Sequence, residues 1–163
     1  GDQIRGTDKM KQLTVMLKPV SSLCNLRCSY CFYDDISSLR EASSFGIMTE
    51  SVARSVLDHI LTELEAKDRL TLSFQGGEPT LAGLDFYRNL TEYIKQKKTE
   101  VQIFYTIQTN GLLLNEEWCE FLAENHVLIG ISCDIHPSAH DHARTDEKKN
   151  GTYHDVPAAK RLF

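Results

Sequence analysis

Three cysteines, Cys24, Cys28 and Cys31, lie close together in the segment LCNLRCSYCFYDD, residues 23–35, with the spacing C-x3-C-x2-C. Disulfides use cysteines in pairs, and a closed zinc site takes four ligands, so three thiols suit neither without a further partner. An iron–sulfur cluster held by three thiolates would keep one iron open to a ligand from outside the protein. The spacing therefore indicates a metal centre with an open position.

Three other interpretations of these cysteines stay open on the residues alone. The thiols could be inert core groups, although the polar residues around them favour a loop, or they could bind zinc with a distant ligand such as a histidine. Cys28 and Cys31 could form a C-x2-C redox pair, which would leave Cys24 unused. Neither Cys119, in a predicted helix, nor Cys133, at the end of a predicted strand, supplies a fourth thiol nearby.

The segments that must position these residues alternate between strand and helix patterns. Apolar residues at every second position predict strands near 13–17, 70–74 and 101–107, and the continuous run VLIGISC at 127–133 predicts a strand covered on both faces. Helical spacing predicts helices over 49–64, 86–94, 115–122 and from Thr152 onwards. The alternation predicts an α/β fold of right-handed βα units around a parallel sheet.

The unusual residues all follow the carboxyl ends of predicted strands. They are the cysteine segment, Gly76–Pro79, Thr109–Gly111 and the segment from Cys133. The carboxyl ends of parallel strands share one edge of the sheet, and ligands bind at that edge in such folds. The sequence therefore places the functional site there.

The segment CNLRCSYCFY resembles the cluster motif of the radical SAM superfamily. FQGGEPTL (74–81), IQTNG (107–111) and GISCDIHPSAHDHAR (130–144) resemble further motifs of that family, in the same order. Together they are similar to the anaerobic sulfatase-maturating enzymes and their peptide-modifying relatives. The resemblance implies that residues 13–163 are the N-terminal portion of a radical SAM domain, a partial TIM barrel, after a frayed or cloning-derived segment at 1–12. The chain is expected to be truncated after about four βα units.

The resemblance also implies cofactors. Cys24, Cys28 and Cys31 would hold a [4Fe–4S] cluster whose open iron binds S-adenosylmethionine (SAM, or AdoMet), and reductive cleavage of SAM would give a 5′-deoxyadenosyl radical. Gly76 and Gly77 would let the backbone approach the methionine ammonium group.

Further positions are implied in the same way. Ser132 and Arg144 would hold the SAM carboxylate, and the Arg fork suits a carboxylate. Tyr30 would lie against the adenosine, with Phe32 as a neighbour, and Gln75 would face the substrate cavity.

The implied reaction is oxidation of a cysteine or serine in a sulfatase to formylglycine, with electrons from a donor such as a flavodoxin or ferredoxin. The catalytic acid of those relatives is expected beyond the end of this chain, so the catalytic residue is unknown here. Alternatives are another peptide or an RNA as substrate, or a zinc-stabilised binding module.

The segment after the last strand departs from the family pattern, because Ile135-His136 stands where Gly-Pro is common. The spacing from Ser132 to Arg144 is kept. His136, His140 and His142 raise the question of a second metal, but Pro137 lies between the first two, which favours a polar loop.

Composition limits the remaining possibilities. The chain has 163 residues, a net charge of -5 and five cysteines. Acidic character argues against a nucleic-acid surface, and an odd number of crowded cysteines argues against disulfides and for a reducing, cytoplasmic location. The sequence shows no apolar run of about 18 residues and no signal peptide, so membrane insertion is not expected.

Overall fold

The computed structural model describes residues 9–33, 44–134 and 136–156. Within them, the predicted α/β class and parallel sheet are confirmed. The helix expected from Thr152 runs into residues 157–163, and most of the segment 1–12 precedes residue 9. Both of those predictions therefore fall largely outside the described residues. No described helix is long and apolar enough to cross a membrane.

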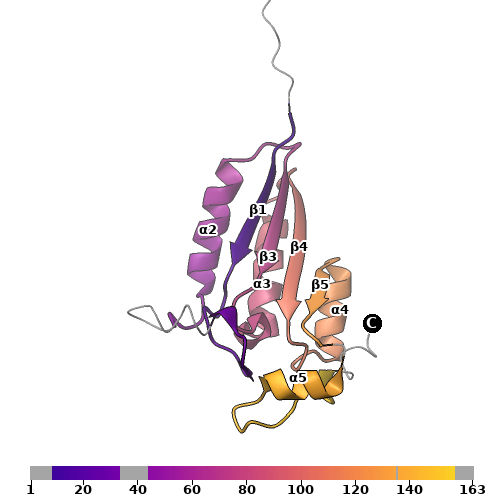
Figure 1. The fold of residues 1–163 in the computed structure, drawn as a ribbon. Helices are drawn as coiled ribbons and strands as arrows, with labels where there is room; N and C mark the ends of the chain where they lie inside the picture. The colour runs from indigo at the N-terminus through magenta and orange to yellow at the C-terminus, as the bar shows by residue number, and fades with distance from the viewer. Residues whose placement is uncertain (1–8, 34–43, 135, 157–163) are drawn as a thin grey trace, which may run out of the picture.

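The central sheet has four parallel strands whose spatial order follows their order in the chain. The strands are β1 (Gln12–Leu17), β3 (Arg69–Phe74), β4 (Gln102–Thr109) and β5 (Leu128–Ile131). Helices α2 (Glu50–Thr62), α3 (Leu84–Gln96) and α4 (Glu116–Glu124) connect them and lie on one face (Figure 1). A sheet whose strand order never reverses, with its helices on one face, is the arrangement of successive βα units in a barrel.

Local interactions fix where the helices begin. The Thr49 hydroxyl accepts a hydrogen bond from Val52 N (3.3 Å), and the Asn115 side chain accepts one from Trp118 N (3.0 Å). Each cap satisfies a backbone N–H that the first turn leaves without a helical partner. Helix α3 has no side-chain cap and instead follows Gly83, whose φ is +84°.

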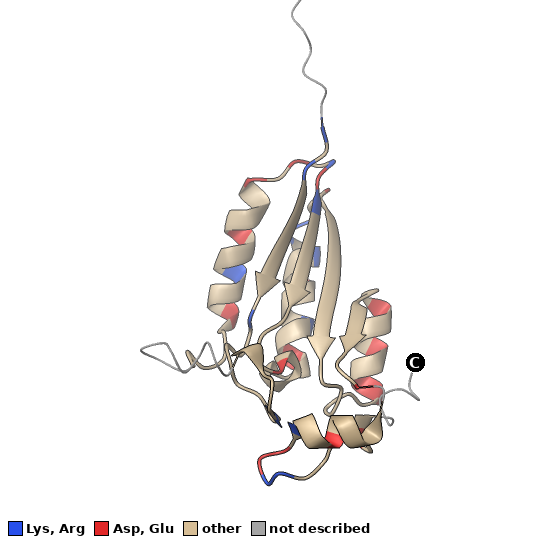
Figure 2. Ribbon diagram, viewed as in Figure 1, with Lys and Arg blue, Asp and Glu red and all other residues tan. Residues whose placement is uncertain are grey.

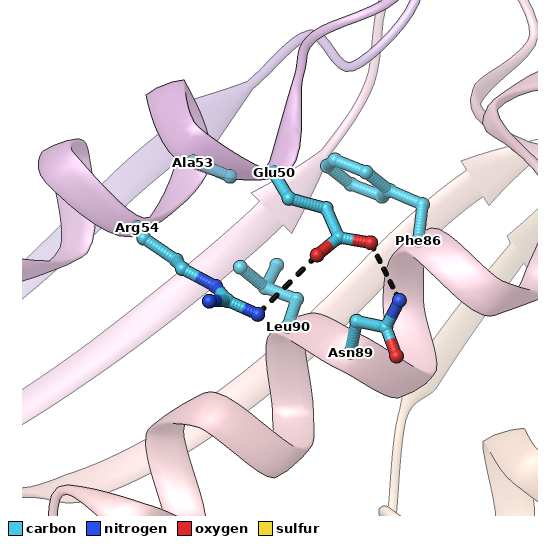
Figure 3. A pocket seen from close by; sticks show the side chains of 6 residues that line it. All are labelled: Glu50, Ala53, Arg54, Phe86, Asn89 and Leu90. Atoms are coloured by element: carbon cyan, nitrogen blue, oxygen red, sulfur yellow. Dashed lines mark hydrogen bonds and ion pairs between the residues drawn. The ribbon is translucent and has the colours of Figure 1, made fainter.

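The core lies between the sheet and the three helices. Leu70 and Leu72 of β3 are fully buried there, and the rings of Phe74 and Tyr87 meet edge to face at 5.0 Å. The crevice between α2 and α3 belongs to this packing (Figure 3). Glu50 fills it by accepting hydrogen bonds from Asn89 (2.5 Å) and Arg54 (3.3 Å). This crevice is a helix contact and not a ligand cavity.

No helix of the described residues covers the opposite face of the sheet (Figure 1), and the strands contain few charged residues, as their tan colour in Figure 2 shows. Side chains alternate along a strand, so the residues that do not face the helices lie here. Leu128 is 71% exposed on β5, whereas Ile129 and Ile131 pack against the core. The prediction that this strand is covered on both faces is therefore wrong for the described residues.

Helix α5 (Pro137–Ala143) and a small antiparallel pair lie across the carboxyl edge of the sheet, the edge where β1, β3, β4 and β5 end (Figure 1). The pair joins β2 (Arg27–Cys28) to β6 (Arg144–Thr145). A polar loop was predicted around the histidines, and that prediction is wrong. Proline lacks an N–H that the first helical turn does not need, so Pro137 starts the helix rather than preventing it.

Candidate functional site

The three cysteines lie at the carboxyl edge, in the loop that follows β1. All are free and partly buried. The Leu26 N–H donates to Cys24 Sγ (3.4 Å), and the Cys31 N–H donates to the Cys28 carbonyl (3.2 Å). These bonds turn the backbone so that residues 24–31, hereafter the cysteine loop, fold compactly at the edge.

The electrostatics of the cysteine loop suit a cationic group. Burial raises the pKa of Cys24 to about 11, and the nearby Glu78, Cys28 and Cys31 add to the rise. Burial also raises the pKa of Cys28. Neighbouring thiolates repel one another, so ionising several of them together costs free energy. A bound metal cation offsets this repulsion and stabilises the thiolates. The sulfur donors therefore fit an iron–sulfur cluster.

A single metal ion has a different requirement. Within the described ranges, no three His, Cys, Asp or Glu side chains come close enough together to hold one ion. A four-iron cluster instead takes each thiolate at a separate iron, so its ligands need not converge on one point.

Gly76 and Gly77 follow β3 and adopt φ values of +84° and +55°. A Cβ on Gly77 would lie 2.1 Å from the Leu23 carbonyl oxygen, and one on Gly76 would lie 3.0 Å from the Ser21 carbonyl oxygen. Both glycines are thus required by the close approach of the chain just before the cysteine loop. The expectation that they also leave room for a ligand stays a prediction.

Glu78 holds the carboxyl edge together. Its side chain is 1% exposed, and it accepts hydrogen bonds from Thr80 N (3.0 Å), the Thr80 hydroxyl (2.6 Å), the Thr109 hydroxyl (2.7 Å) and Asn110 N (2.6 Å). The Asn110 amide in turn donates to Asn25 of the cysteine loop (2.7 Å). The loops after β1, β3 and β4 are therefore joined through one buried carboxylate.

This role of Glu78, which belongs to the motif FQGGEPTL, is not predicted from the sequence. An acidic residue placed between Gly-Gly and Pro, directly after a buried strand, is the signal that could have indicated it. Such a position is buried, and a buried carboxylate needs several hydrogen-bond donors.

Arg144 reaches the cysteine loop from β6, where it pairs with Cys28. Its Nε donates to Asp134 Oδ2 (2.9 Å), and its guanidinium carbon lies 5.1 Å from the centre of the Tyr30 ring. The Tyr30 hydroxyl donates to the same Asp134 oxygen (3.2 Å). The hydrogen bond from Arg144 lowers the pKa of Asp134, so this carboxylate is charged at neutral pH. Phe32 is 68% exposed, and its ring packs against Tyr33.

The histidine and aspartate of the segment HDHAR have structural roles. The buried His140 ring contacts Asp134 N through Nδ1 (3.3 Å) and the Thr152 hydroxyl through Nε2 (3.1 Å). Asp141 accepts a hydrogen bond from Tyr153 N (2.7 Å). These contacts fix the chain on both sides of Arg144. His136 and His142 are exposed.

Ser132 and Gln75 lie on the open face of the sheet near its carboxyl edge. The Gln108 amide donates to the Ser132 hydroxyl (2.9 Å), and the Gln75 amide donates to the Ser73 hydroxyl (3.1 Å). Gln75 and Gln108 both line an open cavity of about 340 Å³, together with Gly130. Two groups of predicted site residues thus come together: Tyr30 and Arg144 lie beside Cys28, and Gln75 and Ser132 lie on the open face.

Comparisons with known proteins agree with this geometry. Residues 19–157 match the model of the Radical SAM superfamily. A cysteine-type anaerobic sulfatase-maturating enzyme of Clostridium novyi is 45% identical over 90% of this chain and 39% of its own length. A serine-type enzyme of Bacteroides thetaiotaomicron is 34% identical over 84% of this chain and 33% of its own.

Solved structures show the same likeness. The structure of native anSMEcpe with bound AdoMet and Cp18Cys peptide has a TM-score of 0.81 and 39% identity, covering 93% of this chain and 40% of that one. The chain therefore spans about two fifths of the length of that structure's chain and of the C. novyi relative. The resemblance inferred from four sequence motifs is confirmed, and the chain belongs to the Radical SAM superfamily.

Proposed function

We propose that this chain is the N-terminal part of an enzyme that binds a [4Fe–4S] cluster and SAM and oxidises a cysteine or serine of a sulfatase to formylglycine. The observation that carries the proposal is the position of the cysteine loop. Its three partly exposed thiols lie at the carboxyl edge, between Gly77 and Arg144. Ligands bind at this edge in parallel α/β folds.

Cys24, Cys28 and Cys31 hold the cluster in this proposal. The reduced cluster and SAM together supply a 5′-deoxyadenosyl radical, which abstracts hydrogen from the substrate. The chain's own contribution is to bind and orient. Burial of the thiols beside one another favours a cationic group in their midst.

Five other residues orient SAM in the proposal. Gly76 and Gly77 present backbone groups to its ammonium, and Arg144 and Ser132 bind its carboxylate. Tyr30 offers its ring to the adenosine. The half-exposed Tyr30 ring and the forked Arg144 guanidinium, both beside the cysteine loop, support these roles.

Gln75 is the proposed contact to the substrate. It lies with Gln108 in the 340 Å³ cavity on the open face, where two side-chain amides can pair with the backbone of an extended peptide. Relatives named cysteine-type are 41–45% identical to this chain, and those named serine-type are 29–34% identical. This difference favours a cysteine as the target residue.

The remaining partners follow from the chemistry. Reduction of the cluster requires an electron donor, for which we propose a flavodoxin or a ferredoxin. Free thiols at a partly exposed site need a reducing surrounding, so we propose a cytoplasmic location.

Anaerobic reconstitution with iron and sulfide, followed by visible absorption and iron analysis, tests the proposal. Wild-type protein should turn brown and hold about four irons, and Cys28→Ala should lose most of both. Cys119→Ala is the matched control, because Cys119 lies in α4, outside the cysteine loop. A wild-type protein that stays colourless, or that holds one zinc instead, would contradict the proposal. Adding SAM and dithionite to the brown protein should then yield 5′-deoxyadenosine.

A further inference from the structure

We propose that Asp134 is a positioning residue that sets which edge of the Arg144 guanidinium meets the carboxylate of SAM. The inference rests on the proposed function, in which Arg144 binds that carboxylate. It adds a residue that the implied cofactor contacts do not include, and it specifies the geometry of the contact.

The donors of the arginine side chain allow two ways of binding a carboxylate. A guanidinium can grip a carboxylate side-on, with Nε and one terminal nitrogen, or end-on, with both terminal nitrogens. Asp134 Oδ2 accepts from Arg144 Nε at 2.9 Å, and only 16% of the Arg144 side chain is exposed. The side-on edge is therefore occupied, and the end-on edge is the one presented to a ligand.

The Tyr30 ring restricts the arginine further. Its hydroxyl donates to the same oxygen of Asp134 (3.2 Å), while the guanidinium lies 5.1 Å from the ring centre. Asp134 thus accepts hydrogen bonds from both the Tyr30 hydroxyl and the Arg144 guanidinium. A cation over an aromatic face and a shared carboxylate leave the guanidinium little freedom to rotate.

The backbones that carry Asp134 and Arg144 are also tied together. Asp134 N–H donates to His140 Nδ1 (3.3 Å), His140 Nε2 contacts the Thr152 hydroxyl (3.1 Å), and that hydroxyl donates to the Arg144 carbonyl (2.8 Å). These three bonds are satisfied together when neutral His140 carries its proton on Nε2. The His140 ring is fully buried, so the link is shielded from water.

The β2–β6 pair connects this unit to the cysteine loop. Cys28 and Arg144 are register partners, so the backbone of the arginine is fixed beside a proposed cluster ligand. The arginine head is therefore held at the point where a cluster ligand and the carboxylate of SAM would meet. A simple surface ion pair between Asp134 and Arg144 would not require the contacts with Tyr30, His140 and Cys28 that hold both side chains in place.

Ligand affinity of the anaerobically reconstituted chain tests the inference, with calorimetry as the measurement. Asp134→Ala should weaken SAM binding about tenfold, which is the loss expected for one orienting hydrogen bond to a charged group. Binding of decarboxylated SAM, which offers Arg144 no carboxylate, should weaken much less, because Asp134→Ala then affects only the Tyr30 ring beside the adenosine. Asp134→Asn should recover most of the affinity for SAM, because an amide oxygen still accepts from Nε.

Two further variants make the result specific. Glu147→Gln breaks the exposed Arg27–Glu147 ion pair beside the β2–β6 ladder and should leave SAM affinity unchanged. Arg144→Ala should weaken SAM more than Asp134→Ala, and the double variant should bind no worse than Arg144→Ala alone. An additive double variant would overturn the inference.

The remaining outcomes separate the inference from the proposed function. Equal losses for SAM and its decarboxylated analogue would show a general structural role, and tighter SAM binding would show that Asp134 competes with the ligand. Either result overturns the inference alone, as does unchanged SAM binding by Asp134→Ala. If that variant fails to hold a cluster, Asp134→Leu, which has a similar shape but no acceptor for Arg144 Nε, gives the same comparison. Reconstituted wild-type protein that binds no SAM overturns the proposed function itself.

Discussion

The carboxylate of Glu78 accepts a 2.6 Å hydrogen bond from the backbone N–H of Asn110, so the loop after β3 is fastened to the loop after β4. Asn110 extends the connection to Asn25, just after the first cysteine. The cysteine loop therefore depends for its position on a buried acid. This dependence can be measured separately from any chemistry at the site.

Glu78→Ala should lower the free energy of unfolding by about 3 kcal/mol, because it leaves buried donors from Thr80, Thr109 and Asn110 without an acceptor. Urea unfolding followed by circular dichroism measures the change. Glu120→Gln on the exposed surface of α4 is the control and should change stability by less than about 0.5 kcal/mol. Equal stabilities for wild type and Glu78→Ala would show that the buried carboxylate does not hold the loops.

Gly77→Ala should destabilise the fold by more than about 2 kcal/mol, since it combines an unfavourable φ of +55° with a collision at the Leu23 carbonyl oxygen. Gly46→Ala separates the two causes. Gly46 also has a positive φ (+76°), but a Cβ there would meet nothing within 4 Å. It should cost about 1 kcal/mol. Similar losses at the two positions in thermal melts would refute the role assigned to the contact with Leu23.

Gly130→Ala should move a side chain rather than the backbone. The new Cβ would lie 2.2 Å from Gln108 Oε1, at the end of an exposed and flexible side chain. The cost should stay below about 1 kcal/mol and should disappear in a Gln108→Ala background, so the two substitutions should not be additive. A double-mutant cycle in urea tests this, and additive losses would count against it.

Tyr105 should make the protein sensitive to alkali. Burial raises the pKa of Tyr105 from 10.0 to about 12. Its contribution to stability is complete below pH 10 and is lost as the pH rises towards 12, because the unfolded chain releases the proton first. Between pH 9 and pH 11.5, the free energy of unfolding of Tyr105→Phe should therefore fall by about 1–2 kcal/mol less than that of the wild type, after allowance for partial exposure. Parallel stability curves for the two proteins would contradict the assigned burial effect.

Most of the framework could be predicted from the sequence, because it rests on local periodicity. Alternation at Leu70, Leu72 and Phe74 and helical spacing around Tyr87 each reflect one buried face, and that signal lies within a few residues. The placement of the site followed from topology, since every cysteine-rich or glycine-rich segment came after a strand. These inferences needed no knowledge of which side chains touch.

The missed features depend on contacts between distant parts of the chain. Asp134 owes its role to Arg144 and Tyr30, which is 104 residues away from it, and no local pattern encodes that meeting. Pro137 favours a loop within a helix but is compatible with a helix that begins at it, and the local sequence does not show where the helix begins. An apolar run such as that around Leu128 predicts a strand, but it does not show whether one face or both faces of the sheet are covered.

The pairing of β2 with β6 has a consequence for how the protein is made. Arg27 of β2 and Glu147, which lies just after β6, are 120 positions apart in the chain. A ribosome adding 5–20 residues per second needs roughly 6–24 s to cover that distance. During this interval the cysteine loop has emerged without its partner strand, and its thiols are open to oxidation. Insertion of the proposed cluster would therefore either follow synthesis of the β6 segment or take place on a loop that is still unpaired.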